Sequence, residues 1–557
     1  MPESASNQTR IKAILWLLIV FALCFDTAFL WQRAGGAYES EYGAHPDEAA
    51  HYVTGLFVRD AVTTIPEAVK LRSITPMKAF GADAPNGFYA HYPKVALGVW
   101  PPGFYVVQTA WTLPFGVSRN SIMLLMAAIA AGVGVLIFQM VRREFGISAG
   151  AIAALLWLSA PLIRMYYGMV MAEMLCAFTM FAATIFWGRY LDSRKTCDAV
   201  LFGVLGAAAI LTKGTGLALA LMVVFSILLS GKLAILGERG TWIGAALVAI
   251  IAGPWTWYFR NAGTQVGGWS DNSGGFSIDF TLKALPFYAR HLVLATGIAI
   301  AVLAIVGIYA RCVKRGENHG RWAAFASLVF GVYVFQCLIP VGDESRHIIA
   351  ATPALVVLAF AGLDWLLSSS RFPAVARLAP ENKRRVMALL LVFLSMPVFA
   401  MTRVKKDTAG FAAPAEWIIE NAPASRVLVC SDAEGEGMFI SEIAMRDERP
   451  GITVERGSKS LVDPKGRTWD GRNLKERFDA DGLVEYLSAG KIDFIVLDSA
   501  VPERRRAGYH DQLTRAIEDN PMQFWKVLES PVTRAGEPMY RPLRLFRIRG
   551  TKNPISQ

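Results

Sequence analysis

The sequence has little of the charge and cysteine expected of a large soluble or secreted enzyme. Only 18% of the 557 residues are charged and 54% are hydrophobic, and the mean hydropathy of +0.37 excludes a soluble enzyme. Of the six cysteines, Cys24, Cys176 and Cys337 fall in apolar runs, Cys197 and Cys312 fall in short basic loops, and only Cys430 falls in the polar tail. This distribution gives no disulfide framework.

The net charge of +11 belongs almost entirely to the apolar part of the chain. Residues 403–557 hold 25 Lys and Arg against 24 Asp and Glu, which leaves 31 of the 56 cations and 21 of the 45 anions for residues 1–402. In a membrane protein such a surplus indicates cytoplasmic loops, because Lys and Arg resist translocation. We therefore expect a membrane-embedded protein with no nucleic-acid partner.

Eleven apolar runs are long enough, or nearly so, to cross a hydrocarbon core about 30 Å thick. A signal peptide would resemble the first run, but ten more runs follow it and no clear small-residue cleavage site does. We therefore expect a first span with a cytoplasmic N-terminus. The runs are 13–31, 120–141, 149–163, 171–191, 199–212, 216–230, 241–258, 287–310, 322–340, 348–367 and 386–402.

Alternation from that start places the basic loops in the cytoplasm, in agreement with the positive-inside rule. Segment 101–117 would reverse the pattern if it crossed the membrane, so we expect a partly embedded or interfacial helix there. Segment 32–119, loop 341–347 and all residues after 402 then lie on the extracytoplasmic face. The basic loop residues are Arg142, Arg143, Arg194, Lys195, Lys232, Arg239, Arg311, Lys314, Arg315, Arg321, Arg371, Arg377, Lys383, Arg384 and Arg385.

Residues 403–557 predict a small extracytoplasmic α/β domain. The pattern favours strands at 426–430, 492–498, 524–528 and 543–548, and helices at 481–489 and 511–519. The sequence EGEG at 434–437 lacks the spacing of a dinucleotide fingerprint and predicts a loop. The fold class is thus mainly α: a polytopic membrane domain of about eleven transmembrane helices over 1–402, with a large outer loop at 32–119, followed by this domain.

The segment HPDEAAHY at 45–52 opens a helix in the first outer loop. Proline followed by two acidic residues is a good helix start, and this alone would explain the pattern. Asp47 and His51 share a helix face, whereas Glu48 is rotated by about 100°. A carboxylate at the membrane surface could also serve as a general base toward an acceptor hydroxyl or amine.

Glu173 and Lys213 interrupt apolar runs on the outer side. An ionisable residue inside such a run is a functional candidate because it is costly there, although pairing of Glu173 with Arg164 would also explain it. Lys213 and the glycines around it form either a tight turn between spans or a site where an ammonium and backbone amides receive an anion.

Arg346 and His347 lie in an outer loop directly before an apolar run. The arginine could bind a phosphate with two parallel hydrogen bonds, or it could cap the interface by pairing with Asp343 or Glu344. The histidines His45, His51, His91 and His347 lack a compact ligand spacing, which disfavours a structural zinc.

Taken in order, these segments resemble the GT-C superfamily of membrane glycosyltransferases, in the branch of protein O-mannosyltransferases and lipid A aminoarabinose transferases. The similarity covers most of residues 10–402. The matching pieces are HPDEAAHY, VWPPGFY, AEMLCAF, LTKGTGL, GPWTWYFR and ESRHIIAATPAL.

The resemblance implies inverting transfer of a sugar from a polyprenyl-phosphate donor to a lipid, glycan or protein acceptor outside the cytoplasm. It implies Asp47 as catalytic carboxylate with Glu48 beside it, and Lys213 and Arg346 at the donor phosphate. It makes Glu173, with His51 and His347, a substrate contact. No cofactor is obligatory, although a divalent cation could bind Asp47 or Glu48.

Two departures from the family pattern affect the acceptor side. His347 replaces an aromatic residue common in relatives, and loop 261–276 is rich in Gly, Ser and Asn. The resemblance further implies a bacterial inner membrane as the location and a cell-envelope glycan as the product. A transporter or flippase of lipid-linked glycan is the main alternative, and a membrane-anchored scaffold is another.

Overall fold

The structure is a computed structural model of the whole chain. It describes residues 2–70, 94, 100–262, 276–314, 319–340, 342–368, 377–401, 404–446, 452–463, 476–489, 492–534 and 537–549. His91, Arg315, Arg371 and nearly all of loop 261–276 lie outside the described residues, so the predictions made for them are not addressed here.

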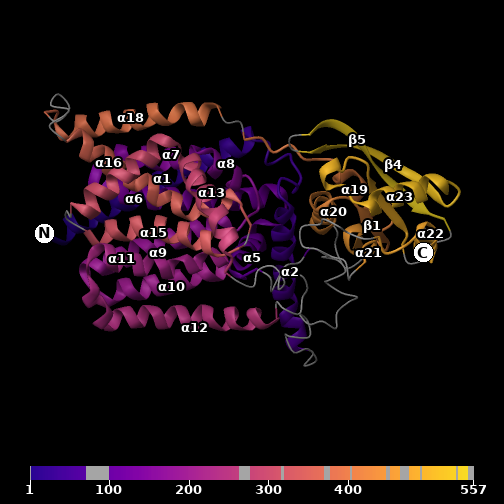
Figure 1. Cartoon of the computed structure of the whole chain (residues 1–557), viewed down its shortest axis with the longest axis horizontal. Coiled ribbons are helices and arrows are strands. Elements are labelled where there is room, and N and C mark those ends of the chain that lie inside the picture. The colour runs from indigo at the N-terminus through magenta and orange to yellow at the C-terminus, as the bar shows by residue number, and fades with distance from the viewer. Residues whose placement is uncertain are drawn as a thin grey trace. The chain divides into compact units, whose positions relative to one another are not determined.

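The chain forms two compact units that interleave along the sequence (Figure 1). The first, which we call the membrane unit, comprises Met1–Gly35, Gly98–Phe104 and Met123–Val404. The second, which we call the tail unit, comprises Gly36–Leu97, Tyr105–Ile122 and Lys405–Gln557. The first outer loop therefore shares a compact unit with the C-terminal residues, and each unit is described by itself below.

The membrane unit is built from helices and contains no strand in the part that the structure describes. Its long helices are α1 (Pro2–Ala34), α6 (Arg119–Phe145), α7 (Ile147–Ser159), α8 (Pro161–Tyr167), α9 (Glu173–Ser193), α10 (Thr196–Thr212), α11 (Ala218–Ser230), α12 (Arg239–Ala262), α13 (Ile278–Thr296), α14 (Ile298–Ile308), α15 (His319–Leu338), α16 (Thr352–Leu367) and α18 (Pro380–Met401). Shorter turns are η1 (Gly214–Leu217), η2 (Leu233–Gly237), η3 (Tyr309–Val313) and η4 (Ser345–Ala351).

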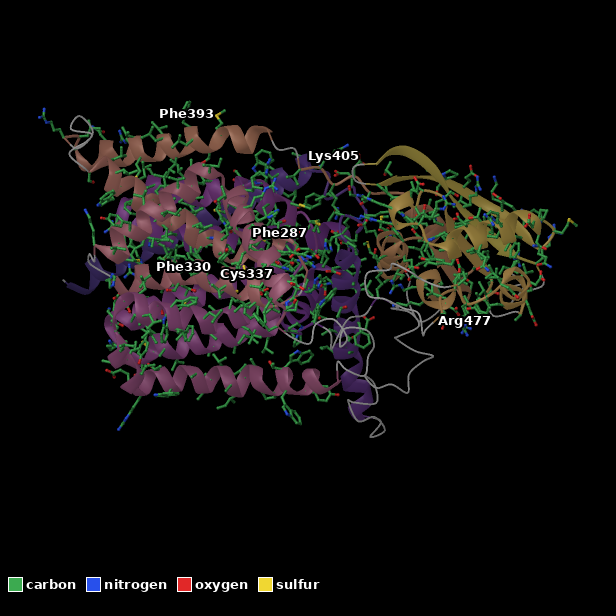
Figure 2. All side chains as sticks on the ribbon, viewed as in Figure 1. Phe287, Phe330, Cys337, Phe393, Lys405 and Arg477 are labelled. Carbon is green, nitrogen blue, oxygen red and sulfur yellow. The ribbon has the colours of Figure 1, made fainter. Side chains whose placement is uncertain are left out.

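All eleven predicted apolar runs lie on helices, and the chain is a multi-pass membrane protein. Among the described residues, six helices are long and apolar enough to cross a membrane, two bent pairs pass the same test together, and three shorter apolar helices account for the other runs. Apolar side chains face outward, as lipid contact requires: Phe393 on α18 is 74% exposed (Figure 2).

The apolar run predicted at 287–310 lies on helices, but it is bent rather than straight. The run is divided into α13 and α14, which meet at 105°. The break lies at Gly297, whose φ of 89° is a conformation that other residues rarely adopt. A glycine inside an apolar run carries no polar signal, so hydropathy alone could not reveal the bend.

Glycine contacts bring the membrane helices close together. A Cβ atom on Gly362 of α16 would lie 1.9 Å from the carbonyl oxygen of Leu303, and one on Gly307 of α14 would lie 2.0 Å from that of Leu358. Backbones in such contact leave no room for a side chain, which is the small-residue packing typical of helices in lipid.

The tail unit contains α2 (Pro46–Lys70), α5 (Gly103–Phe115) from Tyr105 onward, and a C-terminal α/β domain. The helix predicted at 101–117 is therefore confirmed as α5; its position relative to the membrane stays a prediction. The domain's elements are α19 (Ala412–Asn421), β1 (Arg426–Cys430), α20 (Ala433–Arg446), β2 (Thr453–Arg456), α21 (Gly457–Ser460), α22 (Ala480–Ser488), β3 (Phe494–Asp498), η6 (Glu503–Arg505), α23 (Gly508–Asp519), β4 (Phe524–Arg534) and β5 (Glu537–Ile548).

The domain is built on one mixed sheet with strand order β2-β1-β3-β5-β4. The strands β2, β1 and β3 are parallel, and β5 pairs antiparallel with both β3 and β4. Leu428 and Ile495 are opposite each other in this sheet and are fully buried, together with Leu513 of α23. All four predicted strands and both predicted helices are present. The sheet also contains β2, which the sequence pattern did not predict.

The prediction of a loop at 434–437 is also wrong, because these residues form the first turn of α20. The Asp432 carboxylate accepts a hydrogen bond from the Gly435 amide at 2.9 Å and so caps the helix. Met438, Phe439 and Ile440 then pack into the core with no exposed surface. Burial of this apolar stretch outweighs the helix-breaking tendency of the two glycines.

Candidate active site

The segment HPDE builds a fully capped start for α2. His45 precedes the helix, and its Nδ1 accepts a hydrogen bond from the Asp47 amide at 3.0 Å. Pro46 occupies the first helical position, where no amide is needed. Glu48 reaches back and accepts a hydrogen bond from the Ala44 amide at 3.2 Å, in the manner of a capping box.

Glu48 is completely buried and makes a second contact. Its Oε1 lies 2.5 Å from the Nζ of Lys406, which is itself 7% exposed. Burial lowers the pKa of Lys406, although the carboxylate of Glu48 acts in the opposite direction. Both oxygens of Glu48 thus accept hydrogen bonds from protein groups.

Asp47 differs from its neighbour in that 28% of its side chain is exposed. Its Oδ2 is 3.7 Å from His45 Nδ1. Because that nitrogen accepts a hydrogen bond from the Asp47 amide, it cannot also donate one to the carboxylate. Asp47 and Glu48 therefore have separate environments, as their rotation around α2 predicts.

A lysine that the sequence analysis did not consider lies near Asp47. Lys94 is buried, and its Nζ donates hydrogen bonds to the backbone oxygens of Pro46, at 3.3 Å, and of Ala433. Burial and the charge of Arg456 lower the pKa of Lys94 to about 8, against the opposing charges of Glu436, Asp47 and Asp432. The only signal in the sequence was one cation within the apolar and aromatic stretch HYPKVALGVW.

His51 lies one turn after Asp47 on α2 and is buried. Its Nδ1 is 2.9 Å from the hydroxyl of Tyr105 on α5. A second contact joins the same two helices: Gln108 of α5 donates a hydrogen bond to the backbone oxygen of Tyr52 on α2 at 2.9 Å. These contacts fix α5 against α2 within the tail unit. In this structure His51 contacts the hydroxyl of Tyr105.

In the membrane unit, Glu173, Lys213 and Arg346 come together although 173 residues of sequence separate the first from the last. Glu173 begins α9 and is 2% exposed. Its Oε1 lies 2.5 Å from Lys213 Nζ and 3.5 Å from Arg346 Nε. One buried carboxylate therefore bridges two cations.

Arg346 has a second carboxylate partner in its own loop. Its Nε is 2.7 Å from Glu344 Oε2, and its Nη2 donates to Glu344 Oε1 at 3.2 Å. The loop pairing that the sequence offered as an alternative is therefore present. Two cations and two carboxylates balance in this cluster, and Lys213 keeps 22% of its side chain exposed.

The backbone after Lys213 turns sharply before α11 begins. Lys213 ends α10 in an extended conformation, and the amide of Gly216 donates to the Lys213 carbonyl at 2.9 Å. A Cβ on Gly214 would meet nothing within 4 Å, so space surrounds this turn. Gln336 of α15 holds it through a hydrogen bond to Thr215 Oγ1 at 3.2 Å.

His347 follows Arg346 and is held by Tyr288 of α13. Its Nδ1 lies 3.1 Å from the tyrosine hydroxyl, which donates to the backbone oxygen of Gly342 at 2.9 Å. With the hydroxyl proton committed to Gly342, the Nδ1 of His347 carries the donated proton and its Nε2 is an acceptor. His347 thus differs chemically from the aromatic residue that it replaces.

The predicted site residues fall into two groups, with Asp47, Glu48 and His51 in the tail unit and Glu173, Lys213, Arg346 and His347 in the membrane unit. Within the residues that the structure describes, no three His, Cys, Asp or Glu side chains are placed to hold a metal ion. Glu48, proposed as a metal ligand, has hydrogen bonds on both oxygens, so it and Asp47 do not form a ready carboxylate pair for a cation.

Comparisons with known proteins agree with this architecture. Residues 99–258 match the family model of dolichyl-phosphate-mannose-protein mannosyltransferases. A curated UPF0178 protein of Pseudomonas putida is 26% identical over 144 residues, covering 26% of this chain and 85% of that protein, and its name assigns no activity.

Solved structures extend the similarity to almost the whole chain. ArnT from Cupriavidus metallidurans, in the apo state and bound to undecaprenyl phosphate, aligns with a TM-score of 0.58 over 96% of this chain and 98% of that chain, at 15% and 14% identity. The Archaeoglobus fulgidus oligosaccharyltransferase, tethered with an acceptor peptide, aligns with a TM-score of 0.54 over 95% and 76% of the two chains, at 12% identity. At these identities the comparison shows a shared fold.

Proposed function

We propose that this chain, a multi-pass membrane protein with the GT-C glycosyltransferase fold, transfers a sugar from a polyprenyl-phosphate donor to an acceptor. The observation that carries the proposal is the pair of cations, Lys213 and Arg346, bridged by the buried carboxylate of Glu173. An ammonium and a guanidinium held together suit the phosphate of such a donor. ArnT, which shares the fold, has been crystallised with undecaprenyl phosphate.

The chemistry requires stabilisation of the leaving phosphate. When the bond between the anomeric carbon and the phosphate oxygen breaks, that oxygen takes the electron pair, and preorganised cations lower the energy of the developing charge. In our proposal Lys213 and Arg346 supply these cations. Glu173 holds them in place and contacts substrate only through them, a narrower role than the substrate contact we expected.

Attack on the anomeric carbon requires one base. The acceptor oxygen or nitrogen bonds to the face of the anomeric carbon opposite the leaving phosphate, so the configuration inverts, and its proton passes to the Asp47 carboxylate. Asp47 suits this role because its side chain is partly exposed at a rigidly capped helix start. We derive no step through a metal ion, since Glu48 is engaged by Lys406 and Ala44.

The side of the membrane is part of the proposal. The positive-inside rule assigns the loops with Arg142, Arg143 and Arg194 to the cytoplasm. The first outer loop and the α/β domain are then extracytoplasmic, on the outer face of a bacterial inner membrane. The acceptor is a lipid, a glycan or a protein of the cell envelope.

Asp47→Asn tests the proposal. We expect this variant in proteoliposomes supplied with polyprenyl-phosphate sugars to lose transfer, with its melting temperature unchanged. Asp407→Asn is the matched control, because Asp407 is an exposed carboxylate paired with Lys405. Normal transfer by Asp47→Asn would overturn the base assignment. Movement of lipid-linked glycan across the bilayer without transfer by the wild type would favour the transporter alternative.

A further inference from the structure

The segment that follows the last apolar helix is fastened along the entry to α2. Within the tail unit, Ser40 Oγ donates to the Lys406 backbone oxygen and the Glu41 amide donates to the Thr408 oxygen, each at 2.7 Å. Thr408 Oγ1 returns a hydrogen bond to the Glu41 oxygen, also at 2.7 Å. We call residues 40–48 together with 406–412 the clasp.

A buried carboxylate closes one end of the clasp. Glu41 accepts hydrogen bonds from three consecutive amides, those of Gly410 (2.9 Å), Phe411 (3.1 Å) and Ala412 (2.9 Å), where α19 begins. These amides are the ones that a helix start leaves without partners. The first outer loop therefore caps the first helix of the C-terminal domain.

The other end of the clasp is the ion pair of Lys406 and Glu48. The ammonium of Lys406 also lies 5.2 Å from the centre of the Tyr42 ring, so a carboxylate and an aromatic face enclose it. A buried ion pair adds little stability compared with apolar residues of the same size, whereas removing one partner is costly. The best-supported role of a buried ion pair is to select one conformation among several alternatives.

We propose that Lys406 is a positioning residue for Asp47, so that one buried side chain from the segment after the membrane helices supports the active centre. Lys406 and the Ala44 amide hold the two oxygens of Glu48, and this defines the first turn of α2. Asp47 lies in the same turn, about 100° around the helix from Glu48. Fixing Glu48 therefore fixes the direction in which Asp47 projects. This inference rests on the proposed role of Asp47 as base.

Lys406→Met is the first test, in full-length protein with a lipid-linked donor. We expect kcat to fall at least about tenfold, since small misplacements of a reacting group have effects of this size. The KM for the donor should not change, because Lys213 and Arg346 lie in the other unit. Lys406→Arg should recover part of the rate. Lys405→Met is the matched control, since Lys405 is the adjacent, 71% exposed lysine (Figure 2), and it should leave kcat unchanged.

A double variant separates positioning from stability. Lys406→Met leaves the buried charge of Glu48 uncompensated and will lower the melting temperature. Adding Glu48→Gln removes that charge, so the melting temperature should recover. If Lys406 positions Asp47, kcat stays low in the double variant. Recovery of kcat together with the melting temperature would overturn the inference, as would a Lys406→Met variant that is folded and fully active.

The proposed function fails separately from this inference. If wild-type protein transfers no sugar from any polyprenyl-phosphate donor, the enzyme proposal itself is wrong. If the wild type is active and Lys406→Met changes the donor KM but not kcat, the enzyme proposal stands and the positioning role is wrong.

Discussion

In our proposal the donor phosphate binds Arg346, so Glu344 competes with that phosphate, and Glu344→Gln measures the competition. The two shortest printed contacts of the Arg346 guanidinium, at 2.7 and 3.2 Å, are to this carboxylate, whereas Glu173 lies at 3.5 Å. A phosphate that binds Arg346 with two parallel hydrogen bonds must displace it. Neutralising Glu344 while preserving its shape should therefore tighten phosphate binding.

The size of the effect follows from the exposure of the pair. Arg346 is 11% exposed but Glu344 is 36% exposed, so water screens one side of the contact. One charge-assisted hydrogen bond and one close ion contact under such screening are worth about 1 kcal/mol together. Without Glu344 as a competitor, the binding free energy of the phosphate becomes more favourable by this amount, which corresponds to roughly fivefold tighter binding.

The assay is titration of undecaprenyl phosphate into protein in lipid nanodiscs, with Kd measured at low and high salt. We expect Glu344→Gln to lower Kd about fivefold at low salt and less at high salt. Arg346→Ala should raise Kd. Asp343→Asn removes the same charge one residue away and should have a smaller effect. Equal effects of the two neutral variants, or weaker binding by Glu344→Gln, would refute a direct competition at Arg346.

Two further predictions concern stability. Burial and the nearby Glu442 raise the pKa of Glu41 to about 7, so protonation favours the folded state, and the stabilisation present below the ordinary carboxyl pKa is lost as pH rises through about 7. Melting temperature should fall between pH 5 and 8, and Glu41→Gln should flatten this slope; an equally steep slope would contradict the assignment. Gly362→Ala should destabilise the fold by about 1–3 kcal/mol, because its Cβ would lie 1.9 Å from the Leu303 oxygen. Gly253→Ala, whose Cβ would meet nothing within 4 Å, should leave thermal unfolding unchanged, and similar losses in both would contradict the packing argument.

Local patterns predicted the helices and the site residues that depend on one segment. The order of proline and acidic residues in HPDE predicted the start of α2. Helical geometry predicted that Asp47 and Glu48 project in different directions. Among the residues that the structure describes, apolar runs located each helix or helix pair that is long and apolar enough to cross a membrane. The α/β domain followed from short apolar strands bounded by polar turns.

The features that the sequence did not predict depend on contacts between distant residues or on competing local effects. Lys406 is one of two adjacent lysines, and nothing local shows that it is the buried one and Lys405 the exposed one. The first turn of α20 contains two glycines, so its helical state depends on the Asp432 cap and on a core assembled from other strands. The bend at Gly297 depends on backbone conformation, which hydropathy does not encode.

The clasp sets an order of events during synthesis. Glu48 is made early, and its partner Lys406 follows 358 positions later. At about 5–20 residues per second the interval is roughly 20–70 s. Throughout that time the HPDE turn lacks the ammonium that holds it. A chain that stops before residue 406 therefore lacks the ammonium that holds Glu48, and the direction of Asp47 is left unfixed by the clasp.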